Sequence, residues 1–166
     1  MTLHKIVYLP DQRLRQPTKE VTVFDDKLKT LIEDMYETMY HNDGIGLAAP
    51  QIGLSLRLAV IDVSEKRNEN FCIINPQIIQ AEGEDLMDEG CLSVPGVFDR
   101  APRALRVVVR TQDETGKFRE IKGDGLLAHC LQHEIDHLNG KLFVDYLSPL
   151  KRQMARKKLA KNIRRK

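Results

Sequence analysis

Hydrophobic residues recur with a helical period in the segment that follows Pro17. Their three- and four-residue spacing predicts an amphipathic helix with one buried face. Asp25 or Asp26 supplies a capping side chain at its start, and the polar run 42–44 is typical of its end. The expected buried face consists of the following side chains: Leu28, Leu31, Ile32, Met35, Tyr36 and Met39.

Strand-like runs occupy the middle of the chain. Residues 44–53 form a glycine-rich apolar loop, and residues 56–64 and 70–79 are rich in Val, Ile and Leu, which favour strands. Residues 105–112 and 117–122 are separated by a short turn that contains Asp and Gly, which predicts a hairpin. We therefore expect a sheet with at least one antiparallel pair.

Two further helices are expected in the C-terminal third. Asp124 can cap a helix that ends just before Gly140, and Ser148-Pro149 is typical of the start of a final helix, 148–166. The elements come in blocks without a regular alternation of strand and helix, which favours an α+β fold. We expect antiparallel or mixed sheets packed around a central helix that carries an HExxH motif, with an N-terminal and a C-terminal helix.

Length and composition indicate one globular domain, which we expect to span 1–166. The chain has 42% hydrophobic and 30% charged residues and no apolar run of the roughly 18 residues that a spanning helix needs, so disorder and membrane insertion are not expected. The N-terminal segment lacks the apolar core of a signal peptide and the pattern of a transit peptide, which predicts a cytoplasmic protein. The three cysteines, Cys72, Cys91 and Cys130, are typical of thiols in a reducing compartment.

Candidate chemistry centres on the sequence QHEIDH, residues 132–137. His133 and His137 lie about 40° apart on a helix, so both imidazoles can reach one metal ion. Glu134 is displaced by about 100°, which suits a residue beside the ion rather than a ligand. Two structural histidines with a solvated glutamate are the alternative.

A catalytic site of this kind needs a third protein ligand. A metzincin is excluded because Phe143 stands where that motif has its last histidine. A downstream carboxylate ligand, as in the His₂Glu proteases, could only be Asp145, the last acidic residue of the chain. It is a poor candidate that stays open, because it follows the motif too closely for the second helix that those enzymes use. We expect Cys130 to line the pocket and Cys72 to lie in the core. Cys91, next to a predicted turn, is a candidate ligand, with an inert thiol as the alternative.

Three segments, in this order, resemble the motifs of peptide deformylases: GIGLAAPQ at 44–51, EGCLS at 89–93 and QHEIDH at 132–137. All three match the family patterns in full, and the resemblance extends over nearly the whole chain. It implies the fold of that family and an amidohydrolase activity. Such an enzyme removes the N-formyl group from the formyl-methionine of nascent polypeptides and releases formate.

The resemblance implies that Cys91, His133 and His137 bind the metal. One Fe²⁺ per chain is expected, with Zn²⁺, Ni²⁺ or Co²⁺ as substitutes, because sulfur and imidazole ligands suit all of these ions. Water on the metal would be the nucleophile, since the ion lowers its pKa.

The resemblance also implies the remaining catalytic roles. Glu134 would act as general base and then as general acid toward the leaving amine. The Gln51 side chain and the Leu92 backbone N–H would stabilise the developing oxyanion. Beside the Cys91 loop, an ion pair of Glu89 and Arg103 is expected to steady the ligand, with solvated side chains as the alternative.

Substrate is expected to lie along a sheet edge, with its backbone near Gly44, Ile45 and Gly46 and its methionine side chain in an apolar pocket. His129 departs from the aliphatic residue that the family pattern implies, so it would make the pocket more polar. A plain core role is the alternative for Met87 and Leu126. The pocket candidates implied by the resemblance are Ile45, Met87, Leu126, His129 and Cys130.

Charge is distributed unevenly along the chain. Residues 151–166 hold nine Lys or Arg and no acid, whereas residues 1–150 hold 17 basic against 24 acidic side chains. Such a basic helix is attracted to RNA, and the substrate emerges from the ribosome, so we expect 148–166 to dock there. A solvated basic face is the alternative. Residues 64–70, SEKRNEN, are expected to form a solvated loop without a role.

Two other functions remain open at this point. A metalloprotease would cut internal peptide bonds, and a non-catalytic RNA-binding protein would hold a structural metal with four protein ligands.

Overall fold

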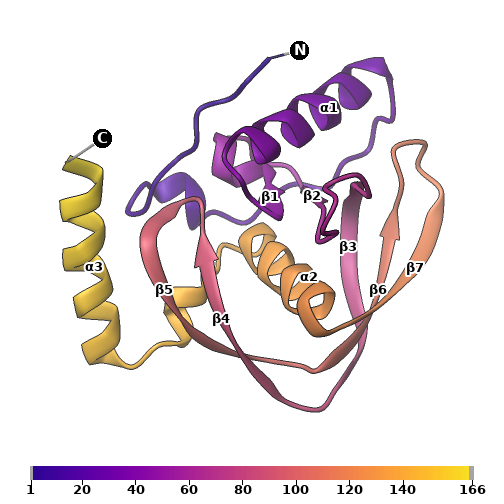
Figure 1. The fold of residues 1–166 in the computed structure, drawn as a ribbon. Helices are drawn as coiled ribbons and strands as arrows, with labels where there is room; N and C mark the ends of the chain where they lie inside the picture. Colours follow the sequence, from indigo (N-terminus) through magenta and orange to yellow (C-terminus); the bar gives the residue numbers. More distant parts are fainter. Residues whose placement is uncertain (1, 165–166) are drawn as a thin grey trace.

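Residues 2–164 of the computed structural model are described here, and they contain three α-helices and seven strands. Helix α1 spans Asp26–His41, α2 spans Gly125–Leu138 and α3 spans Pro149–Arg164 (Figure 1). The short 3₁₀ helices η1, η2 and η3 cover Gln12–Leu14, Ala49–Ile52 and Phe143–Tyr146.

Five strands form one sheet in the order β1-β2-β3-β6-β7. All neighbouring pairs in it are antiparallel, and the predicted hairpin is confirmed as β6 and β7. Strand β1 therefore forms one edge of the sheet and β7 the other. The strands span Gly46–Ala48 (β1), Leu58–Ile61 (β2), Phe71–Glu82 (β3), Arg106–Gln112 (β6) and Phe118–Asp124 (β7).

A separate two-stranded ribbon is formed by β4, Asp85–Cys91, and β5, Val94–Arg103. The sequence pattern indicated only a turn near Cys91, because acidic residues and two prolines interrupt the apolar alternation in this region. A two-stranded ribbon tolerates proline, since one side of each strand has no hydrogen-bonded neighbour. Cys91 thus lies at the end of a strand, not in an isolated loop.

Helix α1 confirms the predicted amphipathic helix. The Asp25 side chain caps it by accepting a hydrogen bond from the Leu28 N–H at 3.0 Å. Of the six predicted core side chains, Leu31 and Tyr36 are half-buried and the other four are buried in the same cluster. The helix therefore covers β1 and β2, which it contacts directly.

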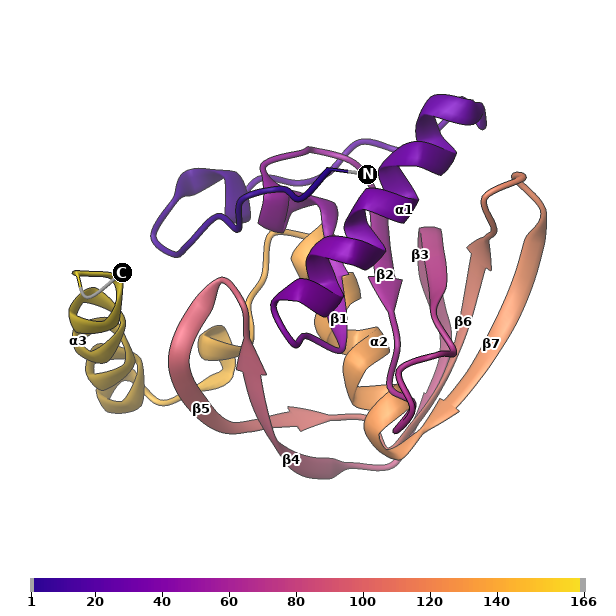
Figure 2. The ribbon, with the colours of Figure 1, turned by 45° about the horizontal axis from the view of Figure 1, so that its top comes forward.

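Helix α2 lies in the interior, between the five-stranded sheet and the β4–β5 ribbon (Figure 1, Figure 2). It contacts β1, β2, β6 and β7 of the sheet and β5 of the ribbon. Its residues Ala128, Leu131, Ile135 and Leu138 share a core cluster with strand residues such as Ile73. Packing on several sides gives the polar side chains of this helix little freedom to move.

Helix α3 packs along β5 and η3. Ala155 and Leu159 are buried against the core, whereas Leu150 and Met154 are exposed. Residues 165–166 of the predicted basic helix lie outside the described residues. No helix between residues 2 and 164 is long and apolar enough to cross a membrane.

Candidate metal centre

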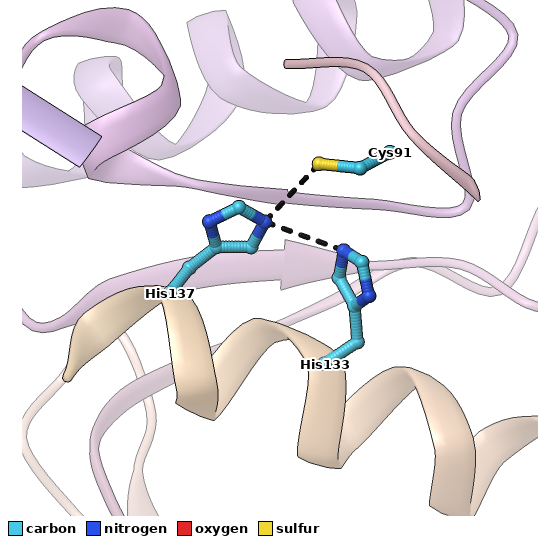
Figure 3. A group of neighbouring side chains, drawn as sticks. All are labelled: Cys91, His133 and His137. Atoms are coloured by element: carbon cyan, nitrogen blue, oxygen red, sulfur yellow. Dashed lines mark hydrogen bonds between the residues drawn. The ribbon is translucent and has the colours of Figure 1, made fainter. Parts of the chain in front are cut away.

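One thiol and two imidazoles converge beside α2. Cys91 Sγ lies 3.2 Å from His137 Nε2, which in turn lies 3.3 Å from His133 Nε2. The three donor atoms all lie within 4.8 Å of one another (Figure 3). The sulfur comes from the end of β4 and the nitrogens from successive turns of α2. Donors of this chemistry that approach from two elements are typical of a transition-metal site.

A buried ion-pair network holds one of the imidazoles. His133 Nδ1 lies 2.9 Å from Glu89 Oε1. Glu89 accepts two hydrogen bonds from Arg103, at 2.8 and 2.9 Å, and Arg103 donates a third to Asp136 at 2.5 Å. The structure thus brings Glu89 and Arg103 together as a bidentate pair behind the donor set. A carboxylate in this position orients the ring whose other nitrogen faces the centre.

The surroundings shift the pKa values of the two histidines in opposite directions. Burial lowers the pKa of His137 well below its ordinary value, and the neighbouring His133 lowers it further. At His133 the hydrogen bonds to Cys91 and Glu89 outweigh the opposing effect of burial, so its pKa lies well above the usual value. Neutral imidazole is the form that ligates metals, so a metal bound here would compete with a proton for His133.

Glu134 lies on α2 beside the donor set. Its side chain is buried, and Oε1 has no hydrogen-bond partner among the described residues. Burial raises the pKa of this carboxyl to about 7, against the opposing effect of the nearby His133. A Cβ atom on Gly46 would collide with Glu134 Oε2, so the carboxylate occupies space that the glycine leaves open. A carboxyl in this state can exchange a proton near neutral pH.

Gln51 lies in the 3₁₀ helix η2, and the expectation of a glycine-rich loop at this residue was wrong. Pro50 stands in the first turn of η2, where its fixed φ favours a helical start. The Gln51 Oε1 accepts a hydrogen bond from the Ala48 N–H at 2.9 Å. Its Nε2 donates to Ser93 Oγ at 3.3 Å and lies 3.5 Å from Cys91 Sγ. The amide N–H₂ is therefore held beside the three candidate metal ligands.

A cavity of about 480 Å³ opens beside this cluster, and Cys91 and His133 lie in its wall. Leu126 is 43% exposed, so the alternative of a core residue is wrong for this side chain. Met87 is half-buried in the cavity wall. All residues predicted to contact substrate line this cavity: Gly44, Ile45, Gly46, Met87, Leu126, His129 and Cys130.

His129 lies in the cavity wall with both ring nitrogens next to carboxylates. The residue is 2% exposed, with Nε2 3.2 Å from Asp85 Oδ2 and Nδ1 3.4 Å from Glu89 Oε2. The imidazole therefore joins the network that includes Arg103 instead of exposing an unpaired nitrogen to the cavity.

The other residues considered as ligands do not belong to the candidate group of Cys91, His133 and His137. Asp145 pairs with Arg15 at 2.6 Å. Cys72 is buried in the core cluster that packs against α1. Cys130 is buried in the cavity wall, with Sγ 3.6 Å from the Ile45 carbonyl oxygen.

The charges of residues 64–70 predicted a solvated loop. In the structure, however, one side chain of this loop is held by specific contacts. Arg67 donates hydrogen bonds to the carbonyl oxygens of Asp62, at 2.7 Å, and of Gly44 in the cavity wall. Its guanidinium carbon lies 5.1 Å from the centroid of the Tyr40 ring. Charge pattern alone could not show this, because the contact depends on how the loop folds back. The one signal in the sequence is Asp62, an acid at the end of an apolar strand.

Known proteins match this chain over almost its full length. The sequence profile of the polypeptide deformylase family matches residues 3–153. Peptide deformylases of Chromobacterium violaceum and Pseudoalteromonas translucida are each 52% identical over 161 residues, which cover 97% of this chain and 96% of each relative.

Solved structures agree with the sequence relatives. A peptide deformylase from Legionella pneumophila has a TM-score of 0.96 and 59% identity, covering 98% of this chain and 96% of that one. A peptide deformylase from Ehrlichia chaffeensis in complex with actinonin has a TM-score of 0.93 and 44% identity, covering 98% of each chain. The chain therefore belongs to the peptide deformylase family, the metal-dependent hydrolases that remove the N-formyl group from nascent peptides.

Proposed function

We propose that Cys91, His133 and His137 bind the catalytic metal ion of this deformylase. The observation that carries the proposal is the meeting of one sulfur and two imidazole nitrogens beside the cavity. This donor set fits iron, zinc, nickel or cobalt, and three ligands leave a position for water. We propose Fe²⁺ as the working ion. Its Lewis acidity would lower the pKa of water and so supply the nucleophile.

Glu134 is the proposed proton carrier. It would accept a proton from the attacking water and deliver it to the amine, which leaves only when protonated. Burial brings its pKa to about 7, whereas a bound cation would favour the charged form that accepts the proton. The lack of a partner for Oε1 within the described structure leaves that oxygen available for water.

Gln51 and Leu92 are the proposed oxyanion donors. The formyl oxygen gains negative charge as water adds to the carbon, and fixed N–H groups stabilise that charge. The Gln51 amide lies 3.5 Å from Cys91 Sγ, and Leu92 directly follows Cys91 in the chain. Both donors therefore lie next to the proposed ligand Cys91, one in space and one along the chain.

The free edge beside Gly46 is the proposed platform for the substrate backbone. Strand β1 is an edge of its sheet, so an extended peptide can add to it through main-chain hydrogen bonds that do not depend on sequence. Gly46 has no side chain to keep that peptide away. The methionine side chain would enter the cavity beside Met87, Leu126 and His129.

One catalytic domain is proposed for 1–166, with α2 at its centre. Val7, Leu14, Val94, Phe143 and Leu159, from both ends and the middle of the chain, share one core cluster. Residues 1 and 165–166 lie outside the part that the structure describes.

Helix α3 is the proposed ribosome-docking element, which would place the enzyme where nascent chains emerge in the cytoplasm. Ala155 and Leu159 face the core, whereas the basic side chains between residues 151 and 161 are exposed. Exposed cations bind the RNA phosphate backbone and release counterions, so this association should weaken steeply with salt.

Substitution tests the docking better than deletion, because loss of α3 would uncover core side chains. Lys157→Gln/Lys158→Gln should weaken co-sedimentation with ribosomes and reduce its salt slope by about 2. Lys27→Gln/Lys29→Gln, an exposed pair on α1, is the matched control. Equal binding by both variants would reject docking through α3.

Formate release from formyl-Met-Ala-Ser by protein loaded anaerobically with Fe²⁺ tests the catalytic proposal. Glu134→Gln should keep the metal and lose about 10² to 10⁴ in rate. Cleavage of unblocked protein would instead favour a metalloprotease. Metal binding without formate release would favour a structural metal site.

A further inference from the structure

A buried carboxylate organises the loop between β2 and β3. Asp62 has no exposed surface, and its Oδ2 accepts hydrogen bonds from the Tyr40 hydroxyl at 2.5 Å and the Glu69 N–H at 3.3 Å. Its Oδ1 accepts from the Ser64 N–H at 2.9 Å and the Ser64 hydroxyl at 2.5 Å. The two ends of the loop are thus tied to one side chain, which limits the conformations open to the residues between them.

This loop places Arg67 against the wall of the substrate cavity. Arg67 has a φ of 57°, a left-handed conformation that is uncommon outside glycine and persists only where surrounding contacts hold it. One guanidinium nitrogen donates to the Asp62 carbonyl oxygen and the other to the Gly44 carbonyl oxygen, while the guanidinium lies over the Tyr40 ring. A planar guanidinium can make all these contacts at once, and an ammonium group cannot.

The segment that Arg67 holds lies between two proposed catalytic groups. A Cβ atom on Gly44 would come 2.8 Å from Leu92 Cδ1, and one on Gly46 would collide with Glu134. Between them, the Ile45 carbonyl oxygen accepts a hydrogen bond from the Asp62 N–H at 2.9 Å. Residues 44–46 therefore lie against the side chains of Leu92 and Glu134 and are hydrogen-bonded to Asp62 at the start of the loop.

We propose that Arg67 is a positioning residue for the peptide substrate. By fixing the Gly44 carbonyl, it holds residues 44–46, which lead into strand β1, in the conformation that is proposed to pair with the substrate backbone. A segment ordered before binding does not have to be ordered by the ligand, which strengthens binding without any direct contact. The inference rests on the proposed use of this edge by the substrate.

Substrates of two lengths separate positioning from a general structural role. Formyl-Met-Ala-Ser has backbone beyond the methionine to pair with the edge, whereas formylmethionine amide has almost none. A loosened edge should therefore impair the tripeptide and spare the amide. A general loss of folded protein would lower the turnover of both substrates in proportion.

The test compares kcat and KM of the Fe²⁺-loaded wild type, Arg67→Gln, Arg67→Lys and Lys66→Gln on both substrates. Arg67→Gln should raise KM for the tripeptide about tenfold, the effect expected for loss of a charge-assisted hydrogen bond, and leave its kcat nearly unchanged. Values for the amide should stay within about twofold of the wild type. The KM of Arg67→Lys for the tripeptide should lie between the values of the wild type and Arg67→Gln. Lys66→Gln, at an exposed neighbouring residue, should match the wild type.

The outcomes distinguish this inference from the proposed function. If the wild type releases no formate from either substrate, the proposed function fails. If the wild type is active and Arg67→Gln keeps the wild-type preference for the tripeptide, the positioning role is refuted. If Arg67→Gln does not fold, as judged by thermal denaturation, an unchanged preference in Arg67→Lys refutes it.

Discussion

Replacing Arg103 with methionine removes the partner of a buried carboxylate. The side chains of Arg103 and Glu89 are 3% and 7% exposed, and two hydrogen bonds join them. Breaking a buried ion pair from one side costs about 3 to 5 kcal/mol, because the remaining charge is left without its partner. Glu89 keeps its 2.9 Å contact with His133, so we expect the low end, about 3 kcal/mol of unfolding free energy.

The lowered pKa of Glu89 corresponds to a free energy of similar size. Burial opposes its ionisation, but hydrogen bonds from Arg103 and His133 outweigh burial and lower the pKa from 4.5 to about 2. That difference corresponds to about 3 kcal/mol, a net value in which burial offsets part of the stabilisation by Arg103 and His133. Since the folded-state pKa is the lower one, this stabilisation is present above pH 4.5 and is lost as the pH falls toward 2.

Urea denaturation of metal-free protein, followed by circular dichroism between pH 7 and pH 2, measures both effects. Arg103→Met should be less stable at neutral pH and should lose much of the wild-type pH dependence below 4.5. Arg106→Met is the control, because Arg106 pairs with Glu82 at 3.6 Å with both side chains more than half exposed. Such surface pairs contribute about 1 kcal/mol or less. If Arg103→Met is as stable as Arg106→Met and keeps the wild-type pH dependence, the reasoning is refuted.

Three further substitutions probe the site and the core. Gly46→Ala should lower kcat by about 10²-fold with the fold intact by circular dichroism, because the new methyl group displaces Glu134; an unchanged kcat would contradict the contact. Gln51→Leu should lower kcat by about 10² to 10³ at unchanged metal content, and a smaller loss would argue against an oxyanion role. Leu159→Ala should cost about 2 to 5 kcal/mol in thermal or urea unfolding, whereas the exposed Leu150 should tolerate the same change; equal stabilities would contradict the packing of α3.

The local sequence pattern was enough to predict elements in which the spacing of apolar residues follows from one buried face. Helix α1 could be predicted from its apolar spacing and its Asp25 cap, because such a helix needs no information from elsewhere in the chain. The proximity of His133 and His137 likewise follows from helical geometry alone. The β6–β7 pairing followed from its turn residues.

Features that depend on distant contacts could not be read from local pattern. The charged β4–β5 ribbon has no continuous apolar face of its own, so only its pairing shows that it is a strand pair. The approach of Cys91 to His137 depends on that ribbon and on α2 together. The motif resemblance implied that this cysteine is a ligand, whereas its position in the sequence alone left an inert thiol open.

Arg67 is the clearest case of a contact that local pattern concealed. The charged run around it is typical of a solvated loop, and its half-buried position depends on the hydrogen bonds by which Ser64 and Glu69 anchor the loop to Asp62, which no periodicity records. Helix α3 is the opposite case, in which apolar residues are exposed. The core covers only one narrow face of that helix, so Leu150 and Met154 remain exposed.

X-ray absorption spectroscopy of the Fe²⁺-loaded protein tests the metal centre most directly. The account predicts one sulfur neighbour at about 2.3 Å and two imidazole nitrogens at about 2.0 to 2.2 Å, with the remaining coordination supplied by oxygen. In Cys91→Ser the sulfur neighbour should disappear while the imidazole signals remain. A wild-type spectrum without sulfur, or one with four protein ligands and no oxygen, would contradict the account.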